Sequence, residues 1–303
     1  MDRPVILRLP CYSKCSIYNG WHIFSNRLVA TVEMAETLKI SLRFCAERER
    51  GKMQEPVRIN KYLSEAGVCS RREADRQVEA GNVTIDGVVA SMGAKVLPDQ
   101  TVLFCGKPVK KEEEMILLAF HKPTGIVCTA EKREKNNVVD YINYPKRIYP
   151  IGRLDKDSEG LLLMTNNGDI VNRIMRAGNM HEKEYIVTVN KPVTDSFLRG
   201  LAGGVPLVEL NATTRKCKVW RIGKRQFGII LTQGLNRQIR RMCEYFGYRV
   251  EKLVRTRIMN IELGDLKAGT YREVTPQEYK ELMRLVKDSS NTTVIHGRDG
   301  GDR

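Results

Sequence analysis

One feature constrains the fold of this chain more than any other: a charged segment, residues 151–160, that runs directly into the apolar residues 161–164. Four consecutive apolar residues favour a buried strand, and the glycines and charges before them favour an exposed turn. The turn carries three carboxylates, Asp155, Asp157 and Glu159. A charged loop on a rigid strand is a common position for catalytic carboxylates. An ordinary solvated loop has the same local pattern, so the rest of the chain has to decide between them.

Charge indicates the class of partner. The chain has 303 residues, enough for about two domains. It carries 51 Lys and Arg against 36 Asp and Glu, a net charge of +15. Such an excess favours a polyanionic partner, most often a nucleic acid, because phosphate binding releases counterions. A basic surface without a specific partner is the alternative, so the positions of the cations matter more than their sum.

Several classes of site have no support in the sequence. Eight cysteines contain no CxxC pair, and there are four histidines, which argues against a zinc site and a disulfide framework. Reduced thiols of this kind fit a cytoplasmic protein. No segment approaches the roughly 18 apolar residues of a membrane span. The P-loop, dinucleotide and HExxH motifs are absent, so we expect no cofactor and no metal.

The two ends are the least informative parts. In residues 1–55, Pro4 and Pro10 interrupt a short apolar run, which is a poor core for a signal peptide. We expect a poorly ordered N-terminal extension; an organellar presequence, or a true start near Met53, are the alternatives. Residues 288–303 are polar and contain glycine, and we expect a disordered tail.

Residues 56–109 have the pattern of a small domain. Ile59, Leu63 and Ala66 share one helical face, and Ser70 with Glu73 has the form of a capping box that opens a second helix. An Asp-Gly pair then separates two strand-like segments, as in a tight hairpin. The cations that lie off the apolar faces of the two helices are Arg58, Lys61, Arg71, Arg72 and Arg76.

This segment, VRINKYLSEAGVCSRREADRQVEAGNVTIDGVV, resembles the S4 RNA-binding domain. The resemblance implies that Arg58, Lys61, Arg71, Arg72 and Arg76 face structured RNA. Contacts of that kind go mainly to phosphates, which position a protein but carry little sequence information. Two helices with solvated cationic faces are the alternative.

After a polar linker, residues 110–115, strands alternate with helices as far as residue 287. We expect strands at 115–120, 126–129, 184–189 and 227–231, and helices that begin after Asp169, Thr194, Asn236 and Thr275. The expected fold class is α+β: the small S4-type domain, then a domain with a mainly antiparallel mixed sheet flanked by helices. Arg237, Arg240 and Arg241 fall in the first turns of one helix, where cations oppose the helix dipole and favour an anionic partner.

Four motifs in order, HKPTGIVCT, GRLDKDSEGLLLMTNNGD, HEKEYIVTV and GLNRQIRRMCEYFGYRVEKLVRTRI, resemble the Rsu/Rlu family of pseudouridine synthases. The segment NRIMRAGNMHEKEYIVTVNKPV is most similar to the F type, which acts on large-subunit ribosomal RNA. Together with the S4 pattern, the resemblance spans residues 57–287. It implies that residues 116–287 form the catalytic domain.

The resemblance implies an isomerisation in which a uridine loses its N1–C1′ bond, the uracil turns, and C5 bonds to C1′. A carboxylate can attack C1′ or stabilise its positive charge. By likeness to the GRLD motif, Asp155 is that carboxylate, and Asp157 and Glu159 are rivals by charge alone. No electron or group donor is needed.

The resemblance also implies roles for other residues. Arg153 would fill the gap left by the flipped base, which costs a few kcal/mol to extrude. Tyr185 would lie against the uracil, Arg240 would pair with Asp155, and Leu253 would close the pocket. We assign Arg237 and Arg241 to RNA phosphates.

The implied substrate is a uridine of 23S ribosomal RNA, free or in a pre-ribosomal particle, with a tRNA anticodon uridine as a second candidate. We expect a monomer. Which uridine is modified cannot be read from the sequence. Two other functions were weighed: a non-catalytic S4-type RNA-binding or ribosome-assembly protein, and a glycoside hydrolase using Asp155 and Asp157. The intact motifs argue against the first, and the spacing of the two carboxylates argues against the second.

Overall fold

The computed structural model describes residues 55–110, 115–131, 133–175, 180–287 and 289, and the backbone of residues 23–24 and 27–28. The expectations for the N-terminal extension, for linker residues 111–114 and for the tail therefore lie almost wholly outside the described residues. The chain divides into two compact units, one of residues 1–57 with 95–100 and the other of residues 58–94 with 101–303.

In the first unit, the described backbone forms short paired strands. Strand β1 (Ile23–Phe24) pairs antiparallel with β2 (Arg27–Leu28). Strand β3 (Val57–Arg58) neighbours β6 (Lys95–Val96) in a two-stranded sheet.

The second unit begins with the helices of the S4-like segment, α2 (Ile59–Glu65) and α3 (Arg71–Glu79). Ser70 Oγ accepts from the Glu73 amide at 3.2 Å, which confirms Ser70 as the helix cap. A four-stranded antiparallel sheet follows in the order β5-β4-β7-β8. Its strands are β4 (Val83–Ile85), β5 (Val88–Val89), β7 (Val102–Phe104) and β8 (Lys107–Pro108). Asp86 and Gly87 both have positive φ, 49° and 82°, which confirms the expected tight hairpin.

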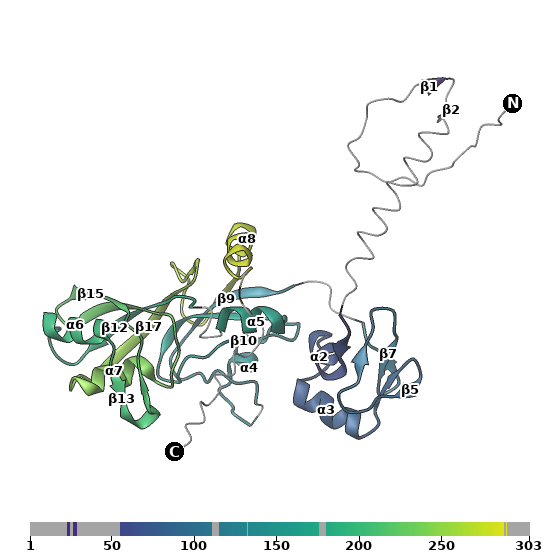
Figure 1. The fold of residues 1–303 in the computed structure, drawn as a ribbon, viewed down its shortest axis with the longest axis horizontal. Coiled ribbons are helices and arrows are strands. Elements are labelled where there is room, and N and C mark those ends of the chain that lie inside the picture. Colours follow the sequence, from purple (N-terminus) through teal and green to yellow (C-terminus); the bar gives the residue numbers. More distant parts are fainter. Residues whose placement is uncertain are drawn as a thin grey trace, which may run out of the picture. The chain divides into compact units, whose positions relative to one another are not determined.

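The rest of the second unit is built on a nine-stranded sheet (Figure 1). Its main order is β15-β16-β12-β17-β11-β9-β19, with β10 on β11 and β18 on β17. β11 pairs with β17 in parallel, and the other described pairs of this sheet are antiparallel, which confirms the mainly antiparallel mixed sheet. The strands are β9 (Leu117–Lys122), β10 (Tyr149–Ile151), β11 (Glu159–Thr165), β12 (Lys183–Val189), β15 (Lys218–Gly223), β16 (Gln226–Leu231), β17 (Val250–Ile258), β18 (Ile261–Glu262) and β19 (Tyr271–Glu273).

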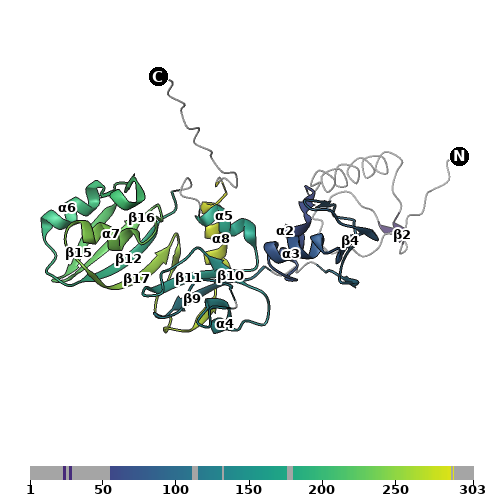
Figure 2. The same cartoon turned by 90° about the horizontal axis from the view of Figure 1, so that it is seen from below.

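Helices cover both faces of this sheet (Figure 2). One core holds apolar residues of α4 (Val138–Ile142), α6 (Asp195–Gly203) and α7 (Gln238–Tyr245). The other holds residues of α5 (Gly168–Met175) and α8 (Pro276–Leu285). Three short elements complete the described residues: strands β13 (Pro206–Leu207) and β14 (Ala212–Thr213), and the 3-10 helix η2 (Val208–Leu210).

The two cores explain the apolar run at residues 161–164. Leu162 and Met164 belong to the first core, and Leu161 and Leu163 belong to the second. Because alternate residues of a strand point to opposite faces, a strand buried on both faces has no polar positions. The expectation of a fully buried strand behind the charged loop is therefore confirmed.

Several local expectations need correction. Residues 126–129 do not form a strand; Val127 makes an isolated bridge to Asn137. The helix expected after Asp169 begins at Gly168, and Asn236 is not a helix cap, because α7 starts with Arg237 in that position. The caps at Thr194 and Thr275 are confirmed, the second as a complete capping box followed by a proline.

Gly160 of β11 lies close to the backbone of Arg255 in β17. It has φ of +110°, and a β-carbon there would lie 2.5 Å from the Arg255 amide nitrogen. We therefore predict that Gly160→Ala lowers the free energy of unfolding by about 2–4 kcal/mol, from strain and a displaced strand. Urea unfolding followed by circular dichroism measures this change.

The matched control is Gly203→Ala. A β-carbon at Gly203 meets nothing within 4 Å, and the residue ends helix α6. Alanine there should leave stability unchanged or raise it by up to about 1 kcal/mol. Equal unfolding free energies for the Gly160→Ala variant and the control would contradict the close strand contact.

Candidate active site

The loop that carries Asp155 joins β10 to β11, and its two ends are held together by the pairing of these strands. Ile151 lies opposite Leu163 in that pair. A turn forms inside the loop, where the Ser158 amide donates to the Asp155 carbonyl at 3.1 Å. Gly152 and Gly160, at its two ends, have φ of 77° and 110°, values that glycine adopts without strain. The sequence expectation of a turn anchored on a rigid strand is confirmed.

Three buried cationic side chains donate hydrogen bonds to the backbone of this loop and of the strand that follows it. Lys122 Nζ donates to the Ser158 carbonyl at 2.7 Å, and Arg240 Nη2 donates to the Asp157 carbonyl at 3.0 Å. Arg255 Nε donates to the Leu161 carbonyl at 2.7 Å. Lys122, Arg240 and Arg255 are only 0%, 7% and 1% exposed. Charged donors make strong hydrogen bonds in such surroundings, so these three side chains fix the path of the loop.

Each of these cations belongs to a different element: Lys122 ends β9, Arg240 lies in α7, and Arg255 lies in β17. The loop is therefore positioned by three separate parts of the fold. Burial lowers the pKa of Lys122, against the opposing charges of Cys128, Asp157 and Asp155. We refer to Lys122, Arg240 and Arg255 as the cationic support of the loop.

Asp155 itself remains accessible, with its side chain 33% exposed. Its ion pair within the described residues is with Arg237, whose Nη1 lies 3.7 Å from Oδ2. Arg237 is in the left-handed backbone region, with φ 49° and ψ 35°, and opens α7 without a side-chain cap. A non-glycine residue in that conformation is uncommon and often marks a functional position.

Asp157 contacts the two arginines that the sequence analysis assigned elsewhere. Arg237 Nη1 donates to its Oδ1 at 3.2 Å, and Arg240 Nη2 lies 3.3 Å from its Oδ2. Partial burial raises the pKa of Asp157, but the Arg237 hydrogen bonds and the charges of Arg240 and Arg237 together hold it below its ordinary value. Asp157 thus neutralises part of the positive charge beside Asp155.

The expected pairing of Arg240 with Asp155 is therefore corrected. Arg240 pairs with Asp157, and Arg237 is the arginine that pairs with Asp155. The reason is the position of the Arg240 side chain, which lies beneath the loop and also donates to Ser158 Oγ at 3.2 Å and to the Val250 carbonyl at 3.3 Å. These partners hold its guanidinium at the end of the loop that Asp157 occupies.

Tyr185 and Leu253 lie on the neighbouring strands. Tyr185 of β12 is opposite Arg255 of β17, and Val187 is opposite Leu253, so Tyr185 and Leu253 are diagonal neighbours on one face. Both belong to the same buried core as Leu154, which immediately precedes Asp155. In the parallel pair, Gly160 at the end of the loop lies opposite Arg255. The fold therefore brings the Asp155 loop, Tyr185 and Leu253 to one region of the sheet.

The other residues that we expected to contact substrate differ in their exposure and in their ion pairs. Arg153 is exposed beside Asp155. Arg241 is engaged by Glu209 in an ion pair, so in this structure it is not free for a phosphate. In the S4-like segment, the side chains of Arg58, Arg71, Arg72 and Arg76 are exposed and Lys61 is half-buried. Arg76 pairs with Glu73, and Lys61 lies 3.5 Å from Glu65.

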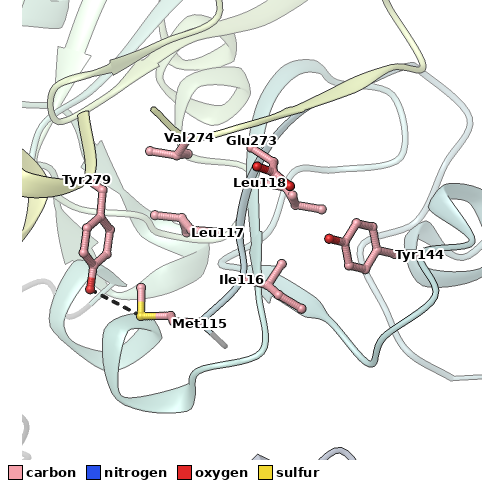
Figure 3. A pocket seen from close by; sticks show the side chains of 8 residues that line it. All are labelled: Met115, Ile116, Leu117, Leu118, Tyr144, Glu273, Val274 and Tyr279. Atoms are coloured by element: carbon pink, nitrogen blue, oxygen red, sulfur yellow. Dashed lines mark hydrogen bonds between the residues drawn. The ribbon is translucent and has the colours of Figure 1, made fainter. Parts of the chain in front are cut away.

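A pocket of about 200 Å³ lies at a different place (Figure 3). It is lined by Met115, Ile116, Leu117, Leu118, Tyr144, Glu273, Val274 and Tyr279. The Tyr279 hydroxyl lies 3.4 Å from Met115 Sδ. The pocket contains none of the site residues expected from the sequence.

Within the residues that the structure describes, no group of three or more His, Cys, Asp and Glu side chains is arranged to hold a metal ion. In the same part of the chain, no helix combines the length and apolarity that crossing a bilayer requires. Cys69, Cys105, Cys128, Cys217 and Cys243 are free thiols.

Comparison with known proteins identifies the family. The sequence model of the S4 domain matches residues 57–102, and that of RNA pseudouridylate synthase matches residues 116–245. The dual-specificity RNA pseudouridine synthase RluF of Escherichia coli K12 is 53% identical over 237 residues, covering 78% of this chain and 81% of RluF. The chain belongs to the RNA pseudouridine synthase family.

Other pseudouridine synthases support the assignment. The ribosomal large subunit pseudouridine synthase B of Bacillus subtilis is 37% identical over 241 residues, covering 77% of this chain and 98% of that protein. A crystal structure of a pseudouridylate synthase matches with a TM-score of 0.56 and 26% identity, over 75% of this chain and 99% of that one. The expected fold class and the expected enzyme class, an isomerase, are both confirmed.

Some of the residues that build this candidate site were not predicted from the sequence. Lys122 was given no role, although a lysine at the end of an apolar strand was an available signal. Arg255 alternates with Val254 and Thr256 in a way that favours exposure, yet it is the buried residue of the three. No local pattern indicated that exception.

We predict that Asp157→Asn lowers kcat about tenfold, the order of one charge-assisted hydrogen bond. Without the Asp157 charge, Arg237 loses its second carboxylate partner and pairs with Asp155 alone, which restrains Asp155. Tritium release from ribosomal RNA transcripts with 5-tritiated uridine measures the rate, because C5 loses its hydrogen in this reaction. Asp265→Asn, at an exposed loop carboxylate, is the control and should keep full activity. Equal kcat for both variants would contradict this role of Asp157.

A second prediction concerns Lys183, which is buried two residues before Tyr185. Burial, and then the charge of Arg255, lowers its pKa to about 8, below the ordinary 10.5. Between these values the unfolded chain binds more protons than the folded one, so stability rises with pH through this window. This contribution, at most roughly 3 kcal/mol, is absent from Lys183→Met.

Urea unfolding between pH 7 and pH 10.5 tests this expectation. The wild-type protein should gain stability relative to Lys183→Met as the pH rises. The exposed Lys280→Met is the control, and its difference from wild type should not change with pH. Parallel curves for wild type and Lys183→Met would show that Lys183 is not held in its neutral form by the fold.

Proposed function

We propose that this enzyme converts a specific uridine of 23S ribosomal RNA into pseudouridine, with Asp155 as the nucleophile. Attack of its carboxylate on C1′, or stabilisation of positive charge there, accompanies cleavage of the N1–C1′ bond. The released uracil turns, C5 bonds to C1′, and the C5 hydrogen is lost as a proton. The observation that carries this proposal is the geometry of Asp155: accessible to substrate, but on a loop held by three buried cations.

The surrounding side chains suit the other steps. Arg153 is exposed beside Asp155, where its guanidinium can stack in the space left by the flipped base. Tyr185 and Leu253 are neighbours in the sheet, and we assign them to the face of the uracil and to exclusion of water. Arg240 acts through the loop backbone and Asp157, and Arg237 balances the charge of Asp155.

The relatives support the choice of substrate. One acts on the ribosomal large subunit by its name, and another is a dual-specificity enzyme. We therefore propose 23S ribosomal RNA, free or in a pre-ribosomal particle, as the first substrate and a tRNA anticodon uridine as a second. We place the S4 domain at residues 56–109, with Arg58, Lys61, Arg71, Arg72 and Arg76 facing RNA, and the catalytic domain at 116–287. A monomer in the cytoplasm completes the proposal.

Asp155→Asn is the decisive variant, because it keeps the shape of the side chain and removes its nucleophilic charge. We expect pseudouridine formation to fall at least about 10³-fold, while RNA binding changes by no more than about threefold. Carbodiimide-blocked primer extension on 23S transcripts maps the product and identifies the uridine. Binding is measured by filter retention of the same transcripts.

Two outcomes would contradict the proposal. An active Asp155→Asn enzyme would exclude Asp155 as the nucleophile. A wild-type protein that binds the transcript but forms no pseudouridine in it would exclude this RNA as the substrate.

A further inference from the structure

Three turns meet at one end of the large sheet. They are residues 190–193 after β12, residues 223–226 between β15 and β16, and residues 247–250 before β17. Main-chain hydrogen bonds join them: Val193 donates to the Lys224 carbonyl at 2.8 Å, and Asn190 donates to the Arg249 carbonyl at 3.1 Å. Each turn contributes a cation, Lys191, Lys224 or Arg249, and we call these three residues the basic end.

The basic end is firmly built. Lys191 Nζ lies 5.1 Å from the centre of the Tyr248 ring, a distance typical of a cation–π contact. Tyr248 stacks on Phe197 of α6 with ring centres 3.9 Å apart, and its hydroxyl donates to the Pro192 carbonyl at 3.0 Å. The Arg249 amide donates to Asn190 Oδ1 at 2.8 Å. The backbone that carries these cations is therefore fixed before any partner binds, which reduces the entropy lost on binding.

The charge of the basic end is not neutralised within the described part of the protein. Lys191, Lys224 and Arg249 are exposed, and the described residues include no ion pair to any of them. Their neighbours Arg221 and Arg225 are paired, with Asp195 and Glu251.

Other surface arginines, unlike the cations of the basic end, are paired with carboxylates. Arg257 pairs with Glu182 and Glu184, and Arg272 pairs with Glu278. Carboxylates thus accompany the cations at these places but leave three positive charges together at the basic end. Clustered charge of one sign attracts a polyanion.

The basic end is connected to the loop between β10 and β11 that carries Asp155, which we call the catalytic loop. Arg249 directly precedes Val250, whose carbonyl accepts from Arg240 Nη1 at 3.3 Å, and Nη2 of the same guanidinium donates to the Asp157 carbonyl at 3.0 Å. Lys252 of β17 pairs with Glu159 at 2.9 Å. Both contacts place the start of β17 and the catalytic loop at the same end of the sheet.

The spacing of residues along β17 indicates how far the basic end lies from the proposed substrate site. Arg249 precedes Leu253 by four positions, or about 13 Å at the usual rise of a strand. A flanking RNA strand can therefore reach from the proposed substrate site to the basic end within a few nucleotides.

We propose that the basic end binds backbone phosphates of the substrate RNA, a few nucleotides from the uridine at Asp155. This inference rests on the proposed function and names a contact surface outside both the S4 domain and the catalytic loop. Phosphate contacts there hold the flanking strand in register while the target base is flipped. The cations act on binding and take no part in the chemical step.

The test is a triple variant of the full-length protein, Lys191→Ala/Lys224→Ala/Arg249→Ala. We expect KM and Kd for 23S transcripts to rise at least about tenfold with kcat unchanged. The slope of log Kd against log salt should fall by about 2–3, because each lost phosphate contact removes about 0.7–0.9 of slope. The matched control is Lys267→Ala/Lys280→Ala/Lys287→Ala, which removes three exposed lysines elsewhere and should leave the slope and KM nearly unchanged.

A second variant separates charge from folding. Lys191→Arg/Lys224→Arg/Arg249→Lys keeps all three charges and should retain the wild-type salt slope. If the basic-end variant and the control lose equal affinity and slope, the surface does not contact RNA and the inference is wrong. A wild-type enzyme that forms no pseudouridine overturns the proposed function instead, and the salt slopes of binding still decide this inference.

Discussion

The site depends on hydrogen bonds from buried cations to the main chain of one loop. Lys122 and Arg240 each donate to a loop carbonyl, and Arg255 donates to the Leu161 carbonyl of β11 and, at 3.5 Å, to the Arg153 carbonyl of the loop. All three side chains are buried. Removing such charges from water costs several kcal/mol per ion, and only well-placed acceptors offset that cost. The loop carbonyls are those acceptors. The loop and its support therefore stabilise one another, and neither would keep its conformation without the other.

This arrangement explains how Asp155 can be both accessible and well placed. The backbone is held from the inside of the protein, so the carboxylate can remain on the outside without contributing to the support. Asp157 takes the contact with Arg240, and Asp155 is left with a single, longer ion pair to Arg237. Under the proposed function, in which Asp155 approaches a sugar carbon, this freedom is useful because a tightly clamped side chain would first have to break its contacts. The basic end would act in a similar way, because its rigid turns would hold RNA beside the site.

Local sequence patterns predicted much of the fold because the responsible interactions are local. The caps at Ser70, Thr194 and Thr275 and the Asp-Gly hairpin depend on residues within three or four positions, and all are present. Asn236 failed as a cap although it has the right chemistry, because Arg237 adopts a left-handed conformation and takes the N-cap position of α7. Residues 126–129 are apolar enough for a strand but find only an isolated bridge. Both errors arise where distant parts of the chain determine the backbone.

By itself, the sequence determined the family motifs, the α+β class and the turn before a buried strand. The tertiary structure alone decided how the charges pair. Sequence spacing did not show that Arg240 would lie under the loop beside Asp157, or that Arg255 would be the buried residue of its strand. The physical reason is that a charge is stabilised by whichever acceptors lie near it in space. Those acceptors are carbonyls and carboxylates from parts of the chain far away in sequence.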